Sequence, residues 1–288
     1  MTKLLISLAL LSITTCLAQQ IPYRQLNDGH KIPIVGLGGN HVTEQSIKDA
    51  LDAGYRHIDT SLNYMGGASE AAIGKVLKET FKEGKIKRQD VYITSKLETE
   101  YHPRKQVSEG IKKSLTNLGL EYLDLYLIHT PASSNGTNIT VGETWEGMID
   151  VLKANLTRSI GVSNFNEKQL DEVIAKGVVP VTNQIICNPY INQNQILSYL
   201  NKHNITLTAY SPIGGTRYPD LLKDKKLIEI GAKHNVTSAQ VALRFEIQRD
   251  IIVIPNSQNP KYLKENVDLF NFKLTDEEIK EIEALNKN

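Results

Sequence analysis

From residue 31 onward, short apolar segments typical of strands alternate with longer amphipathic segments typical of helices. The predicted strands are 32–37, 57–60, 91–95, 124–128, 158–162, 181–187, 206–210 and 251–254. The predicted helices are 43–51, 69–81, 107–118, 143–152, 167–175, 195–203, a long stretch ending at 249, and 261–267, with a polar closing helix from 275. Such alternation favours parallel buried strands with helices outside. Eight units without a linker predict an α/β protein, a single (β/α)8 TIM barrel over residues 19–288.

A further segment precedes the first unit. Tyr23 to Ile34 carries Asn27-Asp28-Gly29 at its middle, a combination typical of a tight turn between antiparallel strands. We therefore expect an N-terminal β-hairpin that covers the bottom of the barrel.

One motif offers an alternative fold. Gly36 and Gly38 lie between a strand and a helix, and Asp59 follows about twenty residues later, as in a dinucleotide-binding Rossmann unit. His41 stands where the third glycine of that motif belongs. Eight continuous units also fit a barrel better than a six-stranded doubly wound sheet.

Polar side chains gather where the predicted strands end. Active sites of barrels lie at this C-terminal face. The residues there are Asp59, Tyr64, Lys96, His129, Ser163, Asn164, Gln184, Tyr210, Asn256 and Ser257. Any one of them is more simply explained as a helix cap or a hydrogen-bonded core residue. Four titratable groups from consecutive strand exits, however, indicate a catalytic site.

The four titratable groups have complementary chemistry. A phenol such as Tyr64 is a poor acid at neutral pH unless a cation such as Lys96 stabilises its phenolate. Asp59 would keep that lysine charged and oriented, and His129 would donate a hydrogen bond to a substrate oxygen. We expect no metal, because His129 has no His or Cys neighbour at ligand spacing. A serine hydrolase is disfavoured because the chain lacks a Gly-x-Ser-x-Gly motif.

Several longer motifs resemble those of the aldo-keto reductases, in that family's order. They are Gly54-Tyr-Arg-His-Ile-Asp59-Thr, Ile93-Thr-Ser-Lys96-Leu, Tyr122-Leu-Asp-Leu-Tyr-Leu-Ile-His129, Gly161-Val-Ser-Asn-Phe165, Asn183-Gln184 and Ala209-Tyr210-Ser-Pro212. The resemblance extends from about Tyr23 to Leu285.

This resemblance implies a function and a set of roles. The chain is expected to reduce a small aldehyde or ketone to an alcohol with NADPH, or alternatively NADH. The implied catalytic residues are Asp59, Tyr64, Lys96 and His129, with Tyr64 as the proton donor. The implied cofactor residues are Ser163, Asn164 and Gln184 at the nicotinamide carboxamide, Tyr210 stacked on the ring, and Ser211, Asn256, Ser257 and Asn266 elsewhere along the cofactor.

The chain departs from the family pattern in its loops. Gly39-Asn40 and Thr130 stand where the family often carries tryptophan, residues 130–142 form a shortened loop, and the long C-terminal loop is missing. We therefore expect an open pocket. Asn256 and Tyr262 replace a lysine and an arginine that usually hold the 2′-phosphate of NADPH, so we expect a weak preference for that cofactor.

The N-terminus predicts secretion. Lys3 precedes an apolar run from Leu4 to Leu11, and small residues precede a cut after Ala18, so residues 1–18 are expected to be a signal peptide. An uncleaved membrane anchor is the alternative, but the run is too short to span a bilayer. Five Asn-x-Thr sites for glycosylation follow, at Asn135, Asn138, Asn155, Asn204 and Asn235.

Charge gives little indication of macromolecular partners. The 33 Lys and Arg residues against 32 Asp and Glu residues give a formal charge of +1, so we expect neither nucleic-acid binding nor membrane binding after signal cleavage. No sequence feature indicates an oligomeric state. A secreted binding glycoprotein that keeps the barrel without turnover is the rival function, but it gives no reason to keep Asp59, Tyr64, Lys96 and His129 together.

Overall fold

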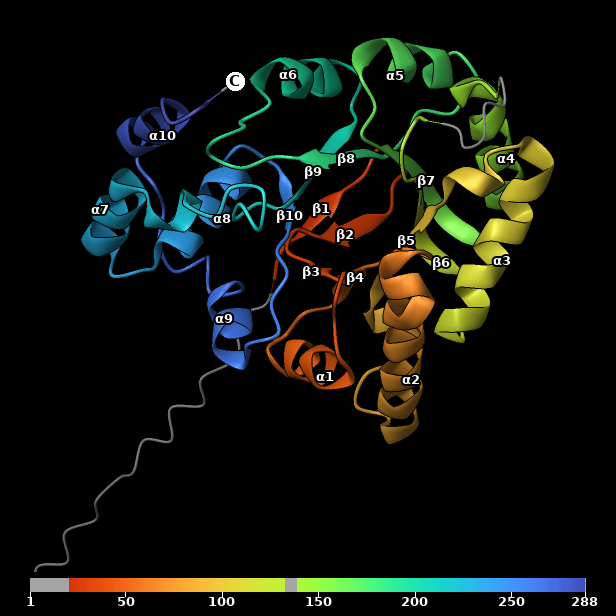
Figure 1. Cartoon of the computed structure of the whole chain (residues 1–288), viewed down its shortest axis with the longest axis horizontal. Helices are drawn as coiled ribbons and strands as arrows, with labels where there is room; N and C mark the ends of the chain where they lie inside the picture. The colour runs from red at the N-terminus through yellow and green to blue at the C-terminus, as the bar shows by residue number, and fades with distance from the viewer. Residues whose placement is uncertain (1–20, 133–138, 288) are drawn as a thin grey trace, which may run out of the picture.

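A computed structural model of the chain describes residues 21–132 and 139–287. Eight parallel strands stand at the centre and helices surround them (Figure 1). In sheet order the strands are β10 (Ile252–Ile254), β9 (Thr206–Tyr210), β8 (Thr182–Ile186), β7 (Thr157–Ser163), β6 (Leu123–Ile128), β5 (Tyr92–Leu97), β4 (His57–Asp59) and β3 (Leu37–Gly38). The helices are α1 (Glu44–Asp52), α2 (Ala68–Glu83), α3 (Val107–Leu118), α4 (Val141–Lys153), α5 (Glu167–Ile174), α6 (Asn194–Lys202), α7 (Lys225–His234), α8 (Ser238–Gln248), α9 (Pro260–Glu265) and α10 (Asp276–Glu283).

The sheet closes between its first and last strands. Val35 bridges Val253 in parallel, and the amides of Gly36 and Gly38 each donate over 2.9 Å to the carbonyls of Val253 and Pro255. This closing seam makes the sheet a barrel. The predicted (β/α)8 fold is thereby confirmed, and the Rossmann alternative is wrong.

The two glycines of the suspected dinucleotide motif have a packing role at the closing seam. A Cβ on Gly36 would lie 2.5 Å from His57 Nδ1, and one on Gly38 would lie 2.9 Å from the Ile254 carbonyl oxygen. The close approach of backbone and ring therefore accounts for glycine at both positions.

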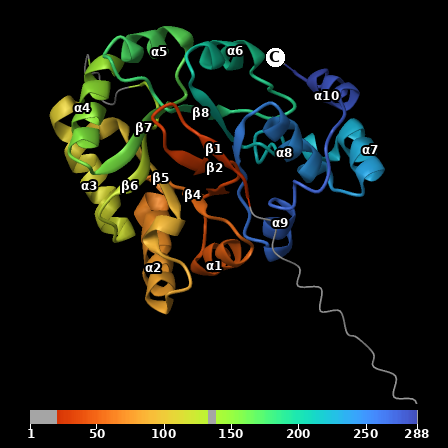
Figure 2. The same cartoon turned by 180° about the vertical axis from the view of Figure 1, so that it is seen from behind.

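The predicted hairpin is also present. β1 (Tyr23–Gln25) pairs antiparallel with β2 (Lys31–Pro33), and the view from behind shows both strands in front of the barrel (Figure 2). Arg24 Nε donates to Thr206 Oγ1 over 3.2 Å, and Asn27 Nδ2 donates to the Pro180 carbonyl over 3.0 Å. Because these partners lie at the N-terminal ends of the barrel strands, the hairpin covers the bottom of the barrel.

The predicted bounds of two elements were wrong. The apolar run 32–37 is not one strand, because the chain changes partners at Ile34. The Ile34 amide donates to the Pro22 carbonyl in the hairpin, and the Ile34 carbonyl accepts from the Val253 amide at the closing seam. Residues Lys31–Pro33 belong to the hairpin, and Leu37–Gly38 belongs to the barrel. The long helix ending near 249 is two helices, since Asn235 adopts a left-handed φ of 55° and Thr237 caps α8 by accepting from the Gln240 amide.

None of the helices within the described ranges has both the length and the apolar character needed to cross a membrane.

Candidate active site

A cavity of about 520 Å³ opens at the C-terminal ends of the barrel strands. Nine of the polar residues predicted from strand exits or from the family motifs line it: Asp59, Tyr64, His129, Ser163, Asn164, Gln184, Tyr210, Ser211 and Asn256. Lys96 lies beneath this surface, bonded to Asp59 and Tyr64. The structure therefore brings the predicted catalytic four to one place.

The floor of the cavity is a buried ion pair with a phenol. Lys96 Nζ lies 2.5 Å from Asp59 Oδ1, 2.9 Å from the Thr60 carbonyl oxygen and 3.1 Å from Tyr64 Oη. Lys96 and Asp59 are each 1% exposed. The ammonium group thus donates all three of its protons in hydrogen bonds to fixed acceptors, one of which is the phenol oxygen.

Local backbone structure explains this convergence. Asp59 ends β4, and Lys96 lies in the adjacent strand β5, where Asp59 pairs with Thr94. Tyr64 begins a short 3-10 turn, Tyr64–Gly67, in which Met65 and Gly66 have left-handed φ values of 53° and 63°. This sharp turn leads into α2 and holds the phenol over the lysine, whose Nζ lies 4.8 Å from the ring centroid.

The electrostatics favour a charged lysine beneath a neutral phenol. Burial lowers the pKa of Lys96, but the charges and hydrogen bonds of Asp59 and Tyr64 outweigh burial and raise it above its ordinary value. Burial raises the pKa of Tyr64, and the charge of Lys96 offsets part of that increase. Tyr64 is therefore protonated at neutral pH, and its oxygen is in contact with a cation that would stabilise a phenolate.

His129 follows β6 and has a partner that the sequence did not reveal. Its Nδ1 atom lies 2.8 Å from Glu98 Oε1, and its ring packs edge-on against Tyr64 with centroids 5.8 Å apart. The Ser61 hydroxyl donates to the same Glu98 oxygen. Glu98 and His129 are 31 residues apart and no motif joins them, so their spacing in the sequence did not predict this contact.

The predicted nicotinamide residues form a hydrogen-bonded row beside the floor. The Ser163 hydroxyl donates to the Gln184 carbonyl over 2.7 Å, and the Tyr210 hydroxyl donates to Asn164 Oδ1 over 3.0 Å. Gln184 Nε2 also donates to Asp59 Oδ2 over 2.6 Å. Neutral amides and a hydroxyl beside an aromatic face suit a flat ring that carries a carboxamide, so this donor set fits a nicotinamide.

Of the residues predicted for the rest of the cofactor, Ser211 and Asn256 line the cavity at its rim, whereas Ser257 and Asn266 do not line it. Asn256 Nδ2 donates to the carbonyls of Gly38 and Asn40 over 2.5 Å each, which ties the loop after β3 to the loop after β10. Ser257 Oγ accepts from the Asn259 amide over 3.1 Å. Asn266 caps α9 and is 2% exposed, so it lies behind the surface of the cavity.

Several lining residues were missed as site residues by the sequence analysis, among them His41, Thr216 and Arg217. His41 follows β3, while Thr216 and Arg217 belong to the loop after β9. The Arg217 guanidinium lies 6.0 Å from the centroid of the Tyr210 ring and brings a positive charge to the mouth. Loop residues of this kind have no periodicity or motif, so only the folded arrangement identifies them.

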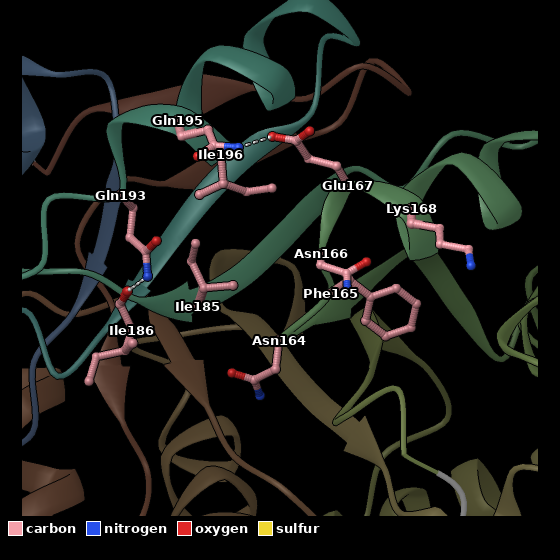
Figure 3. Close-up of a pocket in the computed structure, with 10 residues that line it drawn as sticks. All are labelled: Asn164, Phe165, Asn166, Glu167, Lys168, Ile185, Ile186, Gln193, Gln195 and Ile196. Atoms are coloured by element: carbon pink, nitrogen blue, oxygen red, sulfur yellow. Dashed lines mark hydrogen bonds between the residues drawn. The ribbon is translucent and has the colours of Figure 1, made fainter. Parts of the chain in front are cut away.

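A larger hollow of about 670 Å³ lies beside this cavity and shares Asn164 with it (Figure 3). Two of its polar side chains bond to other residues of its lining: Gln195 Nε2 donates to Glu167 Oε1 over 3.3 Å, and Gln193 Nε2 donates to the Ile186 carbonyl over 2.9 Å. It holds no buried acid–base pair like Asp59 and Lys96. The chemistry therefore belongs to the smaller cavity.

Within the described ranges, no group of three or more His, Cys, Asp and Glu side chains is placed to hold a metal ion. The predicted signal peptide 1–18 and the sites Asn135 and Asn138 lie outside the described residues. Asn155, Asn204 and Asn235 are exposed on the surface.

The strand ends of this (β/α)8 barrel hold a phenol in contact with a lysine, an imidazole beside the phenol, and hydrogen-bonding groups that fit a nicotinamide. This combination defines a class of protein, the oxidoreductases built on a barrel. Comparison with known proteins narrows the class. The model of the Aldo/keto reductase family matches residues 40–287. The chain is 39% identical over 298 residues to aldo-keto reductase family 1 member D1 of Mus musculus, covering 91% of this chain and 90% of that protein.

Solved structures agree with this match. An aldo-keto reductase of Bombyx mori, determined in complex with NADP, superposes with a TM-score of 0.88 at 37% identity, covering 93% of this chain and 94% of that one. The aldose reductase of Schistosoma japonicum gives a TM-score of 0.86 at 34% identity, with 93% of each chain covered. The chain belongs to the aldo/keto reductase family. It is an NADP(H)-dependent oxidoreductase that reduces a carbonyl group to an alcohol.

Proposed function

We propose that Tyr64 donates the proton to the carbonyl oxygen of the substrate and that Asp59, Lys96 and His129 support this transfer. The observation that carries the proposal is the contact of 3.1 Å between Lys96 Nζ and Tyr64 Oη, made while the same ammonium is paired with buried Asp59. A positive charge fixed at that distance stabilises the phenolate left behind when the proton moves.

Other residues around the floor of the cavity would bind the cofactor and the substrate. The reduced nicotinamide, when bound, supplies a hydride to the carbonyl carbon. Ser163, Asn164 and Gln184 would hold its carboxamide, and Tyr210 would pack on its ring. The Tyr64 hydroxyl and the imidazole of His129 line the same cavity and would bind the substrate oxygen between them. The proton then passes from Tyr64 Oη to that oxygen, while Lys96 keeps its own proton.

Replacing Tyr64 tests this assignment. Tyr64→Phe removes the donated proton and preserves the ring, so turnover of a generic aldehyde should fall about 100-fold or more. Cofactor affinity, measured by quenching of intrinsic fluorescence, should change little. Near-normal turnover in this variant would exclude Tyr64 as the donor.

We further propose that NADPH is preferred over NADH by less than about 100-fold. A charged contact to the 2′-phosphate contributes on the order of 1.5–3 kcal/mol, and neither Asn256 nor Tyr262 carries a charge. Lys261 and Lys264 are the neighbouring cations, and Lys261 is already 3.7 Å from Glu265. Steady-state kinetics with both cofactors give the ratio directly.

Secretion with N-glycosylation is also proposed. Its support is the signal-like segment 1–18 together with the exposure of Asn155, Asn204 and Asn235. These three asparagines have left-handed φ values of 58°, 54° and 55°, a conformation that by itself favours asparagine after a helix. These three sequons are thus weaker support for secretion than the N-terminal segment.

Mass spectrometry of material from a eukaryotic host tests the secretion proposal. Secreted protein should begin at Gln19 or within a residue or two, with glycan mass on some sites. An intact Met1 with no glycan, on protein retained in the cells, would contradict it.

A further inference from the structure

The environment of His129 determines which of its ring nitrogens a substrate meets. Nδ1 lies 2.8 Å from Glu98 Oε1 and 3.4 Å from Ser61 Oγ, whereas the side chain as a whole is 26% exposed and lines the cavity. Since Nδ1 is engaged on the protein side, Nε2 is the ring nitrogen left for a ligand in the cavity.

Glu98 is a buried carboxylate in this contact. Its side chain is 9% exposed, and the Ser61 hydroxyl donates to the oxygen that faces His129. Burial raises the pKa of Glu98, but hydrogen bonding and charge from His129, together with bonds from Ser61 and the Asn63 backbone, outweigh it and hold the pKa below its ordinary value. The carboxylate is therefore ionised and accepts the proton on Nδ1.

This arrangement limits what a neutral His129 can do. A neutral imidazole carries one N–H, and a carboxylate opposite Nδ1 places that proton on Nδ1. Nε2 is then a lone pair, which cannot donate to a carbonyl oxygen. The neutral tautomer with the proton on Nε2 would set the Nδ1 lone pair against the Glu98 carboxylate, which is repulsive.

We propose that Glu98 is a positioning residue that makes the doubly protonated imidazolium of His129 the form that donates from Nε2 to the substrate oxygen. The proposal rests on the role given to His129 above. No other bond changes: Glu98 stays a carboxylate throughout, and the transferred proton still comes from Tyr64.

Other ionisable groups around the pair do not supply the same charge. His102 is held neutral because burial lowers its pKa to about 4. Burial raises the pKa of Glu70, which bonds Ser95 and lies on the far side of β5, and burial raises the pKa of Tyr126 well above its ordinary value. Among the described residues, the Tyr64 ring packs on His129, and the Lys96–Asp59 pair beneath Tyr64 carries two opposite charges that balance. Within the same residues, Glu98 is the charged side chain in direct contact with His129.

Glu98→Gln tests the proposal because it keeps the shape and removes the charge. A glutamine amide can donate to Nδ1, which permits the neutral form with its proton on Nε2. The ratio of kcat/KM between wild type and variant, measured with saturating NADPH, should be about tenfold near pH 6. It should fall as the pH rises and drop below unity where His129 is neutral, because a wild-type imidazole with its proton on Nδ1 cannot donate from Nε2 whereas the variant can. A ratio that stays constant with pH overturns the proposal, since damage to packing alone would act equally at every pH.

Glu100→Gln is the matched control. It removes the exposed carboxylate of the turn Thr99–Tyr101, two residues further on, and should leave the pH profile unchanged. Tyr64→Phe separates the two hypotheses. If that variant loses turnover while the Glu98→Gln ratio is constant, only the role of Glu98 fails; if it keeps turnover, the proposed function fails.

A measurement on the wild-type protein covers the case in which Glu98→Gln does not fold. With ¹⁵N-labelled histidine and bound NADP⁺, His129 is assigned among the seven histidines by its absence in His129→Gln. Nitrogen shifts should show Nδ1 protonated in both the neutral and the doubly protonated form of His129. An unprotonated Nδ1 facing Glu98 overturns the proposal.

Discussion

The floor and the rim of the cavity are built by different means. At the floor, Asp59 and Lys96 are 1% exposed, come from neighbouring strands and lie 2.5 Å apart. At the rim, Asn256 donates hydrogen bonds to the backbone carbonyls of Gly38 and Asn40, and Tyr262, further along on α9, is 52% exposed. The groups of the reaction are therefore fixed by strand pairing and charge, whereas the groups that meet the far end of the cofactor stand on loops with few constraints.

The largest expected effect comes from removing the charge at the floor. Lys96→Met should lower turnover about 100-fold or more and should lower the free energy of unfolding by about 3–5 kcal/mol, because it leaves Asp59 buried without a counter-charge. Activity assays and urea unfolding measure the two losses. The double variant Asp59→Asn with Lys96→Met should regain stability without regaining turnover, and Lys82→Met, on an exposed face of α2, should change neither quantity. Full stability in Lys96→Met would contradict the contrast between floor and rim.

A smaller effect is expected from adding a charge at the rim. Tyr262→Arg places a guanidinium on an exposed position of α9, and should move the ratio of kcat/KM for NADPH over NADH toward NADPH by about tenfold. Unfolding free energy should stay the same, since Tyr262 has no side-chain hydrogen bond to lose within the described residues. The same substitution at Tyr23, which is 49% exposed in the hairpin at the opposite end, is the control and should leave the ratio unchanged.

The smallest effect is expected for Asn256→Lys. Lysine adds the charge, but the amide bonds to the Gly38 and Asn40 carbonyls are lost, so we expect a shift toward NADPH of about threefold. The same kinetic ratio measures it. A wild-type preference of about a thousandfold or more would show that another residue already supplies the charge at the rim.

Much of the fold followed from the sequence because periodicity and turn residues determine it locally. α3 and β9 have the predicted bounds, Val107–Leu118 and Thr206–Tyr210, and Thr43 and Thr275 cap helices as capping-type residues do. The errors fall where one residue interrupts a continuous pattern. The chain changes hydrogen-bonding partners at Ile34 within an apolar run, and Asn235 ends a helix within an amphipathic stretch.

The floor of the site was predictable for a similar reason. Strand ends of a barrel meet at one face, so Asp59, Lys96 and His129 had to converge once eight units were counted. The contact of Glu98 with His129 depends on how the loop after β5 folds back, and the periodicity of the sequence does not predict the conformation of that loop. Gln184 likewise bonds Asp59 across the barrel, from a position 125 residues away.

The closing seam has a consequence for local opening. β3 contributes only Leu37–Gly38, and its junction with β10 depends on one bridge and a few backbone bonds, whereas β6 and β7 pair along five positions. Amide protons at Gly36, Gly38 and Val253 should therefore exchange with deuterium sooner than those at the centre of β6. The loops that flank the seam carry Asn40 and Asn256. A ligand that bridges these two loops would therefore slow the exchange of the amide protons at the seam and stabilise the closed barrel.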